Sequence, residues 1–307
     1  MAFQKIKKFI RKEIPEKYFR RLKFYYRKYI IRKKSAIFYL SFLCNYNCPY
    51  CIIKRAGYPE CYPKGVEHSW EEWVKVFEKK SPSIINITGG EPFLYPNLIE
   101  LVNNIPKKHI VNITTNLSLP VKEFINRVSK RFQITASFHS YEADSDSFKN
   151  KVIQLKKAGF NIHVTFVGYP EKIYLIPDLK RRFEALDVIF NVNPYIDPDY
   201  KYSDKEIEII KKYTGSLRRM GFEDKCVLKK CYAGSMHSII LPNGDVYACH
   251  AGMYYNTSPL HQKFKVKKNF YLGNIFSGTL KFHKKSIICS SPCNEACDIE
   301  SAFVEEL

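Results

Sequence analysis

The sequence predicts an α/β fold in which a parallel sheet is covered by helices. Three observations support this prediction. Short, mainly apolar runs alternate with amphipathic stretches through six repeats between residues 36 and 213. Apolar runs of this kind are typical of strands that are buried on both faces, as in parallel sheets. Several of the amphipathic stretches also begin at residues that commonly cap helices.

The element bounds follow from periodicity and from start and stop signals. The predicted strands cover residues 36–43, 83–88, 109–115, 133–139, 161–167 and 187–194. The predicted helices cover residues 69–79, 97–105, 121–130, 146–158, 175–186 and 203–213. Asp144 or Ser145 opens the fourth helix and Gly159 stops it, while Ser203 with Glu206 three residues later forms a capping box.

Length and composition set the organisation. A chain of 307 residues, 45% hydrophobic and 26% charged, can hold one large α/β domain and a small appendage. No run of eighteen apolar residues and no secretory signal is found, so we expect a cytoplasmic protein, with peripheral association at a membrane as the alternative. Ten cysteines in such a chain indicate metal ligands rather than disulfides.

The N-terminal segment 1–34 is strongly basic. Residues 5–34 contain fourteen Lys or Arg against Glu13 and Glu16, and the whole chain carries a formal charge of +20. Apolar residues recur there at helical spacing, which predicts an amphipathic helical segment. Such a segment suits an anionic membrane surface. A helix packed against the domain remains an equal alternative, and nucleic-acid binding is not expected.

Three cysteines, Cys44, Cys48 and Cys51, follow the first predicted strand within eight residues. Three thiolates suit an iron–sulfur cube held at three corners, with the fourth iron open to another ligand. A structural zinc site usually needs four protein ligands. Part of a zinc knuckle or a disulfide loop remains the alternative for this spacing.

The second predicted strand ends in Gly89, Gly90, Glu91 and Pro92. Two glycines allow the backbone to come close to a ligand, and Glu91 can accept from a cationic group. A tight strand-to-helix turn is the alternative. Together, the C-x3-C-x2-C spacing and the Gly-Gly-Glu-Pro segment resemble the signatures of the radical S-adenosylmethionine (SAM) enzymes.

The resemblance implies a partial (β/α)6 TIM-like barrel over residues 35–215, with a [4Fe–4S] cluster and SAM at the carboxyl ends of its strands. It implies a metal site at Cys44, Cys48 and Cys51, and SAM contacts from Tyr50, Gly89, Gly90, Glu91, Pro92, Asn116 and Ser137. Asn116 and Ser137 are equally explained as turn residues. His139 is a candidate for substrate contact or proton transfer, unless a backbone carbonyl holds its ring.

The remaining 216–307 region is rich in cysteine. Asn243-Gly244 predicts a hairpin that places Cys231 and Cys249 near its two ends. This arrangement resembles the start of the SPASM or Twitch extensions, which carry auxiliary clusters. An auxiliary [4Fe–4S] cluster is predicted on Cys231, Cys249, Cys293 and Cys297, with Cys289 or Cys226 able to replace one ligand. The closing cysteines depart from both extension patterns, and a zinc ribbon is the alternative.

The resemblance implies reductive cleavage of SAM to a 5′-deoxyadenosyl radical that abstracts hydrogen from a substrate. Oxidation, epimerisation and cross-linking remain open, and Cys226 or Cys289 could return a hydrogen atom in an epimerisation. A sugar or lipid-linked substrate is predicted, with ribosomal peptides or protein side chains as the alternative. An external one-electron reductant of the flavodoxin or ferredoxin type is the implied partner. A different class, a non-catalytic metal-stabilised protein that binds polyanions, predicts zinc and no turnover.

Overall fold

Six parallel strands form the centre of the fold, and each pairs with its neighbours in chain order. The computed structural model describes residues 34–58, 68–195, 200–214, 229–254, 270–289 and 304–306. The central strands are β1 (Lys34–Ser41), β2 (Ser83–Gly89), β3 (Ile110–Thr115), β4 (Gln133–Phe138), β5 (Asn161–Gly168) and β6 (Ile189–Pro194). The predicted order of strands is therefore confirmed.

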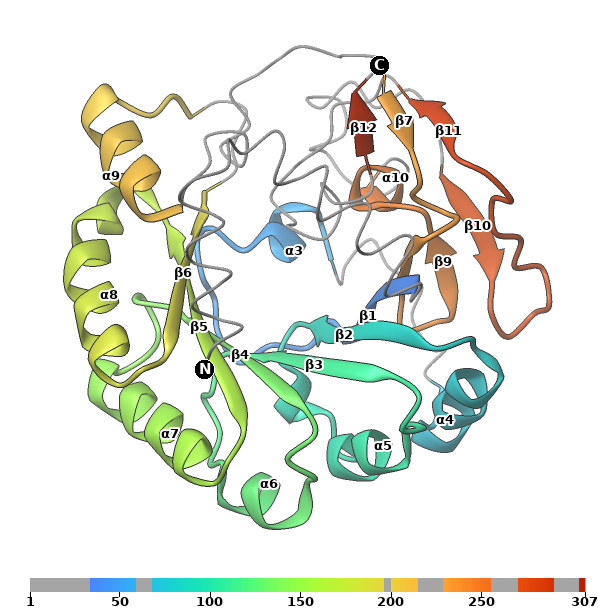
Figure 1. Cartoon of the computed structure of the whole chain (residues 1–307), viewed down its shortest axis with the longest axis horizontal. Helices are drawn as coiled ribbons and strands as arrows, with labels where there is room; N and C mark the ends of the chain where they lie inside the picture. Colours follow the sequence, from blue (N-terminus) through green and yellow to red (C-terminus); the bar gives the residue numbers. More distant parts are fainter. Residues whose placement is uncertain are drawn as a thin grey trace.

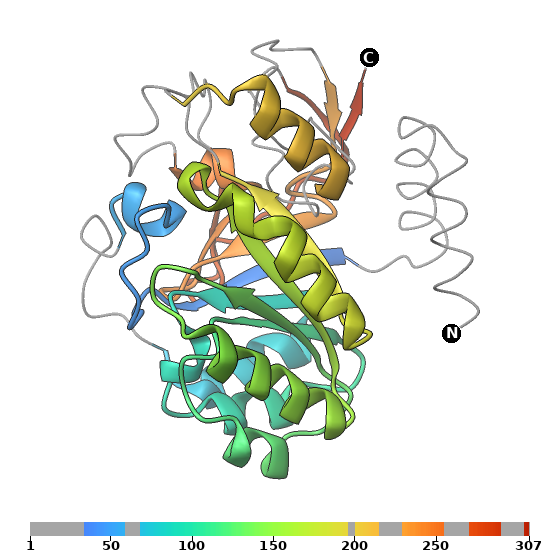
Figure 2. The ribbon, with the colours of Figure 1, turned by 90° about the vertical axis from the view of Figure 1, so that its left-hand side faces the viewer.

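A helix follows each of these strands and lies on the outer side of the curved sheet (Figure 1). Figure 2 shows the later helices of this layer in front of the strands. The helices are α4 (Trp70–Lys79), α5 (Leu98–Asn104), α6 (Lys122–Arg127), α7 (Ser145–Lys157), α8 (Ile176–Ala185) and α9 (Asp204–Thr214). Between the strands and these helices run a short helix α3 (Ile52–Arg55) and the 3₁₀ turns η2 (Pro92–Leu94) and η3 (Pro170–Leu175). The arrangement is an open, partial barrel.

The main hydrophobic core lies between the sheet and the helices. Trp73 and Phe77 of α4 pack on Phe38 of β1, with ring centroids 4.4 and 5.4 Å apart. Alternate residues of each strand, such as Ile85 and Ile113, are fully buried on this side. Burial of these side chains is the main favourable term that holds the helical layer in place.

The opposite, concave face of strands β2 to β6 is polar. Successive side chains of a strand point to opposite faces, so the residues between the core positions share this face. They include Asn86, Asn112, Thr135, Ser137, His163, Thr165, Asn191 and Asn193. Most of them remain partly exposed. The strands are thus less uniformly apolar than predicted, because only one face contributes to the core.

Capping residues act as predicted. The Asp144 carboxylate accepts from the Ser147 N–H at 2.7 Å, and Gly159 beyond α7 has a φ of +91°. Ser203 and Glu206 form the reciprocal bonds of a capping box. The other bounds agree within two residues, but α6 ends at Arg127 rather than at residue 130; among the two-residue differences, β1 ends at Ser41 rather than at residue 43. The apolar sequence continues beyond Ser41, but Leu43 is 62% exposed because the chain has left the sheet.

The C-terminal strands extend the same sheet. The predicted hairpin is formed by β8 (His237–Ile240) and β9 (Asp245–Tyr247), and β8 pairs in parallel with β1. Strand β10 (Tyr271–Asn274) continues the sheet beyond β9, and helix α10 (His250–Tyr254) follows β9. A second sheet contains β11 (Ile287–Cys289), β7 (Lys229–Cys231) and β12 (Val304–Glu306), in that order.

The basic segment predicted over residues 1–34 lies, except for Lys34, outside the described residues. Within the part of the chain that is described, no helix combines the length and the apolar character required to cross a lipid bilayer.

Candidate functional site

Gly89 and Gly90 bring the ends of β1 and β2 into close backbone contact. A Cβ atom on Gly89 would lie 2.1 Å from the Ser41 carbonyl oxygen, and one on Gly90 would lie 1.9 Å from that of Leu43. The Gly90 N–H donates to the Ser41 carbonyl at 2.8 Å, and the Glu91 N–H donates to the Leu43 carbonyl at 2.7 Å. The close approach predicted for a ligand is therefore made by the chain's own backbone.

Glu91 is buried directly behind this contact, with 1% of its surface exposed. Its carboxylate accepts from the Asn116 N–H at 2.6 Å, the Thr115 hydroxyl at 2.7 Å and the Phe93 N–H at 2.9 Å. Burial raises the pKa of Glu91, and these three donors oppose that rise. Glu91 therefore joins the carboxyl ends of β2 and β3.

The cysteine loop begins where this backbone contact ends. Cys44, Cys48 and Cys51 are free thiols on the segment between β1 and α3. The Cys51 N–H donates to the Cys48 carbonyl at 3.1 Å, which closes a turn between the second and third cysteines. Lys54 of α3 donates to the Tyr46 carbonyl at 3.2 Å and to the Asn47 side chain at 2.9 Å, so α3 and the loop brace each other.

The thiols fit an iron–sulfur cube. Burial and the neighbouring Cys51 raise the pKa of the Cys48 thiol to about 12, and burial also raises the pKa of Cys44. A bound cation is what would keep such thiols in the thiolate form. The Tyr46 N–H already donates to the Cys44 sulfur at 3.4 Å. Among the described residues, no three His, Cys, Asp or Glu side chains could hold one metal ion; in a cube, separate irons bind separate thiolates.

Asn116 links Glu91 to the cysteine loop. Its backbone bonds Glu91, and its side-chain Nδ2 lies 3.3 Å from Asn45 Oδ1 and 4.0 Å from the Cys44 sulfur. Its Oδ1 also accepts from the Ser118 N–H at 2.8 Å, as a turn residue would. The structure thus brings Asn116 to the predicted site and gives it a turn-forming contact as well.

Tyr50 and His139 form a pair beside the cysteines. The Tyr50 hydroxyl lies 3.1 Å from His139 Nδ1, and the rings stack with centroids 5.8 Å apart. The ring nitrogen is therefore paired with a hydroxyl rather than with a backbone carbonyl. Burial lowers the pKa of His139 to about 4, so the imidazole is neutral at pH 7. Ser137, two residues earlier, lies 3.1 Å from the Thr165 hydroxyl on the concave face.

Tyrosines extend this pair along the edge of the sheet. Tyr169 lies 5.4 Å from Tyr50 and 4.9 Å from Tyr195, measured between ring centroids, and Tyr141 lies 5.7 Å from Tyr169. The Arg55 guanidinium lies 5.0 Å from the centroid of the Tyr195 ring. Tyr141 and Tyr169 were not predicted as site residues from the sequence. Their positions in the sequence could have identified them, because each closely follows the carboxyl end of a strand.

The C-terminal cysteines are only partly described. Cys231 pairs with Ile287 in the antiparallel ladder, so Cys289, two residues further on, lies diagonally across on the same face of the small sheet. Both are buried, and Cys249 is half-buried just after β9. Cys226, Cys293 and Cys297 lie outside the described residues. The structure therefore adds Cys289 to the neighbourhood of Cys231.

Residues 38–172 match the sequence profile of the radical SAM superfamily. The chain is 28% identical over 176 residues to GTP 3',8-cyclase of Aquifex aeolicus, which covers 50% of this chain and 54% of that protein. It is 30% identical over 166 residues to 7-carboxy-7-deazaguanine synthase of Clostridium acetobutylicum, with 50% and 68% covered. The chain thus spans about half the length of the cyclase.

Solved structures share the fold at low identity. anSMEcpe with bound AdoMet superposes with a TM-score of 0.56 at 18% identity, covering 80% of this chain and 76% of that one. Streptococcus suis SuiB bound to precursor peptide SuiA gives 0.55 at 17% identity, covering 74% and 61%. Both similarities cover a larger share of this chain than the matched profile does.

The contact at Gly90 is testable by adding one methyl group. We expect Gly90→Ala to displace the cysteine loop, because the new Cβ would overlap the Leu43 carbonyl, and to cost about 1–3 kcal/mol of stability. Iron per chain after anaerobic reconstitution and the thermal unfolding midpoint should both fall. Gly168→Ala is the matched control, since its Cβ would meet no atom closer than 3.4 Å. Equal iron content in the two variants would contradict this role.

Proposed function

Because this chain belongs to the radical SAM superfamily, whose members are enzymes that use a [4Fe–4S] cluster and SAM, we propose that it cleaves SAM reductively and abstracts hydrogen from a polar substrate. The observation that carries the proposal is the position of three free thiols at the carboxyl edge of the sheet, directly after Ser41 and Leu43, whose carbonyls accept from the Gly90 and Glu91 N–H groups. When bound, the cluster and SAM supply one-electron cleavage of the sulfonium C–S bond to give a 5′-deoxyadenosyl radical.

The chain's own residues hold and orient these groups. Cys44, Cys48 and Cys51 would ligate the cluster, and the edge from Gly89 to Pro92 would bind the amino group of SAM. A carboxylate has about four acceptor sites, and Glu91 uses three of them within the protein. The remaining site is the one available to an ammonium. Asn116 and Ser137 are proposed for the ribose or carboxylate of SAM.

The Tyr50–His139 pair would flank the nucleoside. A stacked, apolar wall beside the cysteines suits an adenine ring and helps to exclude water. A neutral His139 can hydrogen-bond a substrate hydroxyl without adding a charge to the site. We propose Tyr50 for the adenine and His139 for the substrate side.

An auxiliary [4Fe–4S] cluster is proposed in the C-terminal region. Cys231, Cys249, Cys293 and Cys297 are the predicted ligands, and the position of Cys289 beside Cys231 favours Cys289 as a replacement for one of them. Four thiolates also suit zinc, so metal analysis distinguishes the two. A free thiol left over from this set could return a hydrogen atom to a substrate radical.

The concave face supports an uncharged polar substrate. No Asp, Glu, Lys or Arg occupies the alternate positions of β2 to β6 that share this face, whereas amide and hydroxyl side chains fill most of them. Such groups recognise hydroxyls and amides by hydrogen bonding. A sugar and a peptide backbone both meet this requirement, and a long hydrocarbon chain does not.

Two substrates are therefore proposed. A sugar, free or lipid-linked at its distant end, is the first. A ribosomal peptide or protein side chain is the second, and it is favoured by the fold shared with SuiB, which is bound to its precursor peptide. The electron would come from an external reductant of the flavodoxin or ferredoxin type, and the exposed Leu43 beside the cysteine loop offers it an apolar contact.

Replacement of the three loop cysteines tests the reaction class. Reconstituted anaerobically, the wild-type chain should hold ~8 iron with two clusters, or ~4 with one, and should form 5′-deoxyadenosine from SAM under reductant. Cys44→Ala/Cys48→Ala/Cys51→Ala should abolish 5′-deoxyadenosine and leave the C-terminal iron in place. Zinc in the purified wild-type chain without any SAM cleavage would instead support a non-catalytic polyanion-binding protein.

A substrate panel tests the neutral polar face. We expect uncharged glycosides or short peptides to stimulate 5′-deoxyadenosine formation several-fold, because a bound substrate couples SAM cleavage to hydrogen abstraction. Fatty acids and polyanionic compounds should not stimulate it. The readout is 5′-deoxyadenosine by chromatography, compared with product mass. Stimulation by fatty acids alone would contradict the assignment.

The basic N-terminal segment is proposed to contact an anionic membrane. Flotation with anionic liposomes should recover the full chain, and a shortened chain lacking residues 1–33 should bind several-fold less, because eleven net positive charges lie in residues 5–33. Liposomes of neutral lipid provide the control. Equal flotation of both chains would show that this segment is not the anchor.

A further inference from the structure

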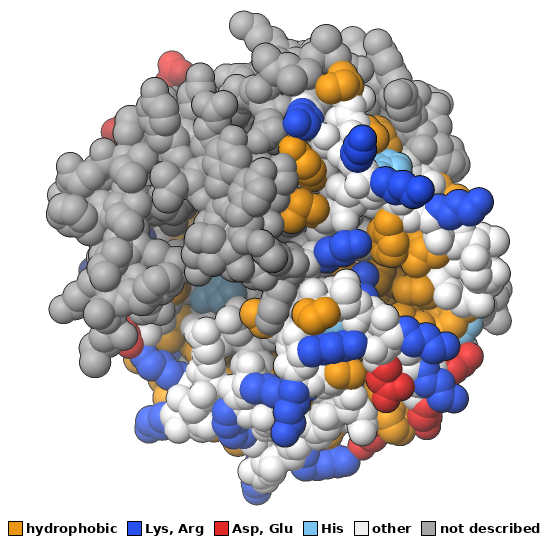
Figure 3. Space-filling model, turned by 45° about the vertical axis from the view of Figure 1, so that its right-hand side comes forward, with side chains coloured by type: hydrophobic (Ala, Val, Ile, Leu, Met, Phe, Trp, Pro, Cys, Tyr) orange, Lys and Arg blue, Asp and Glu red, His pale blue; other side chains and the backbone are white. Residues whose placement is uncertain are grey.

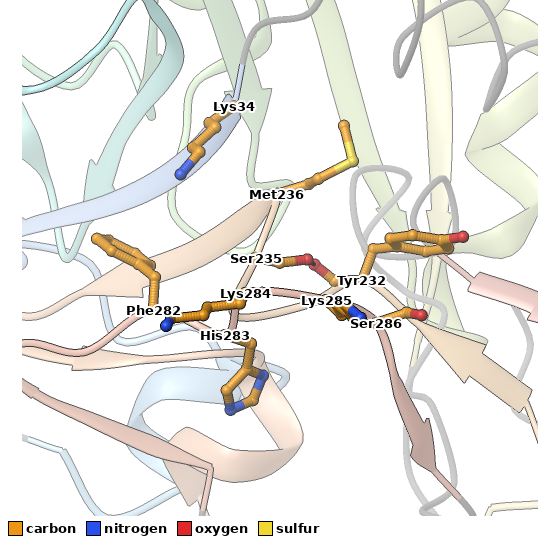
Figure 4. A pocket seen from close by; sticks show the side chains of 9 residues that line it. All are labelled: Lys34, Tyr232, Ser235, Met236, Phe282, His283, Lys284, Lys285 and Ser286. Carbon is orange, nitrogen blue, oxygen red and sulfur yellow. Dashed lines mark hydrogen bonds between the residues drawn. The ribbon is translucent and has the colours of Figure 1, made fainter.

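A cavity of about 530 Å³ lies at the end of the sheet opposite the cysteine loop. Lys34, the first residue of β1, lines it, whereas Cys44 follows the other end of the same strand. At ~3.3 Å per residue the two sites are separated by roughly 25 Å. Figure 4 shows the lining side chains: Lys34, Tyr232, Ser235, Met236, Phe282, His283, Lys284, Lys285 and Ser286. The cavity is therefore separate from the proposed SAM site.

Three chain segments meet to build this cavity. Because β8 is parallel to β1, the turn that precedes β8 lies beside the start of β1, and the Ser35 N–H donates to the Met236 carbonyl at 2.8 Å. The His283 N–H donates to the Gly234 carbonyl at 2.8 Å. A Cβ on Gly234 would lie 2.6 Å from His283 Nδ1, so this turn and the segment before β11 are in close contact. Backbone hydrogen bonds therefore hold the segments that form the walls of the cavity together.

The cavity is positively charged without a compensating carboxylate. Lys34, Lys284 and Lys285 line it, and no Asp or Glu does. Lys80 adds a fourth cation: its ammonium and that of Lys34 each lie 5.2 Å from the Phe282 ring centroid. Within the described part of the chain, none of these four lysines forms an ion pair. Figure 3 shows Lys and Arg side chains spread over the described part of one face of the molecule, with fewer Asp and Glu side chains among them.

The proximity of Lys34 and Lys80 has an electrostatic cost. Burial, and then the charge of Lys34, lower the pKa of Lys80 to about 8. The Phe282 ring, which both ammonium groups approach, offsets part of this repulsion through cation–π attraction. A bound anion would offset more, because it would face several ammonium groups at once.

We propose that this cavity binds a phosphate group. A phosphate presents several acceptor oxygens and about two negative charges, which match a cluster of lysine point charges together with the hydroxyl of Ser286. The phosphate can belong to a phosphorylated small molecule or to a phospholipid headgroup. The second source would place the start of β1, and hence the basic segment that precedes it, against a membrane.

Charge removal at the exposed rim of the cavity tests the proposal. Lys284→Gln/Lys285→Gln removes two positive charges, and Lys122→Gln/Lys157→Gln removes two from exposed positions on α6 and α7. Pyrophosphate binding is measured by calorimetry, and binding to phosphatidylglycerol and phosphatidylcholine vesicles by sedimentation, at ~0.15 M salt to screen diffuse attraction. We expect about tenfold weaker binding for the first pair and unchanged binding for the second.

The pyrophosphate and vesicle assays distinguish a free phosphorylated ligand from a phospholipid headgroup. Weakened pyrophosphate binding in the cavity pair alone supports a free phosphorylated ligand. Undetectable pyrophosphate binding, with phosphatidylglycerol vesicle binding weakened in the cavity pair alone, supports a lipid headgroup. Equal weakening in both pairs, or no weakening in the cavity pair with either probe, overturns the proposal.

Discussion

Two backbone hydrogen bonds hold the cysteine loop to the sheet, from Gly90 N–H to the Ser41 carbonyl and from Glu91 N–H to the Leu43 carbonyl. They form only because neither glycine carries a Cβ, which would overlap those carbonyls. The carboxylate of Glu91 then ties the end of β3 to the same point. The position of the thiols relative to the strand ends therefore depends on one close contact between two neighbouring strands, and the proposed chemistry depends on that position.

The two faces of the sheet differ in composition and in role. The convex face supplies the core with residues such as Ile85 and Ile113, and its burial stabilises the helical layer. The concave face contributes little to that core and is lined by groups that bond one another, as Thr135 does with Asn112 and His163. Because this face has few apolar side chains, it adds little to the stability of the fold. Its hydrogen-bonding groups can instead hold a polar substrate.

Strand β1 joins two sites of opposite character. Its carboxyl end leads into the loop of thiols that is proposed to bind the iron–sulfur cluster. Its amino end begins at Lys34, in the cavity whose lysines are proposed to bind a phosphate. The C-terminal hairpin is bonded to the same strand, so Cys249, which follows β9, and the lysine cavity share its framework. One central strand, buried on both faces, therefore sets the geometry of every site proposed for this chain.

The sequence by itself determined the features that depend on local spacing: the six strand–helix repeats, the caps at Asp144 and Ser203, and the hairpin at Asn243-Gly244. Periodicity and turn chemistry act within a few residues, so one chain segment is enough to reveal them. Tertiary structure alone decided what the glycines approach, that Tyr50 pairs with His139, and that the hairpin extends the main sheet. Those contacts join residues far apart in sequence, and the register of pairing between strands, which no local pattern encodes, brings them together.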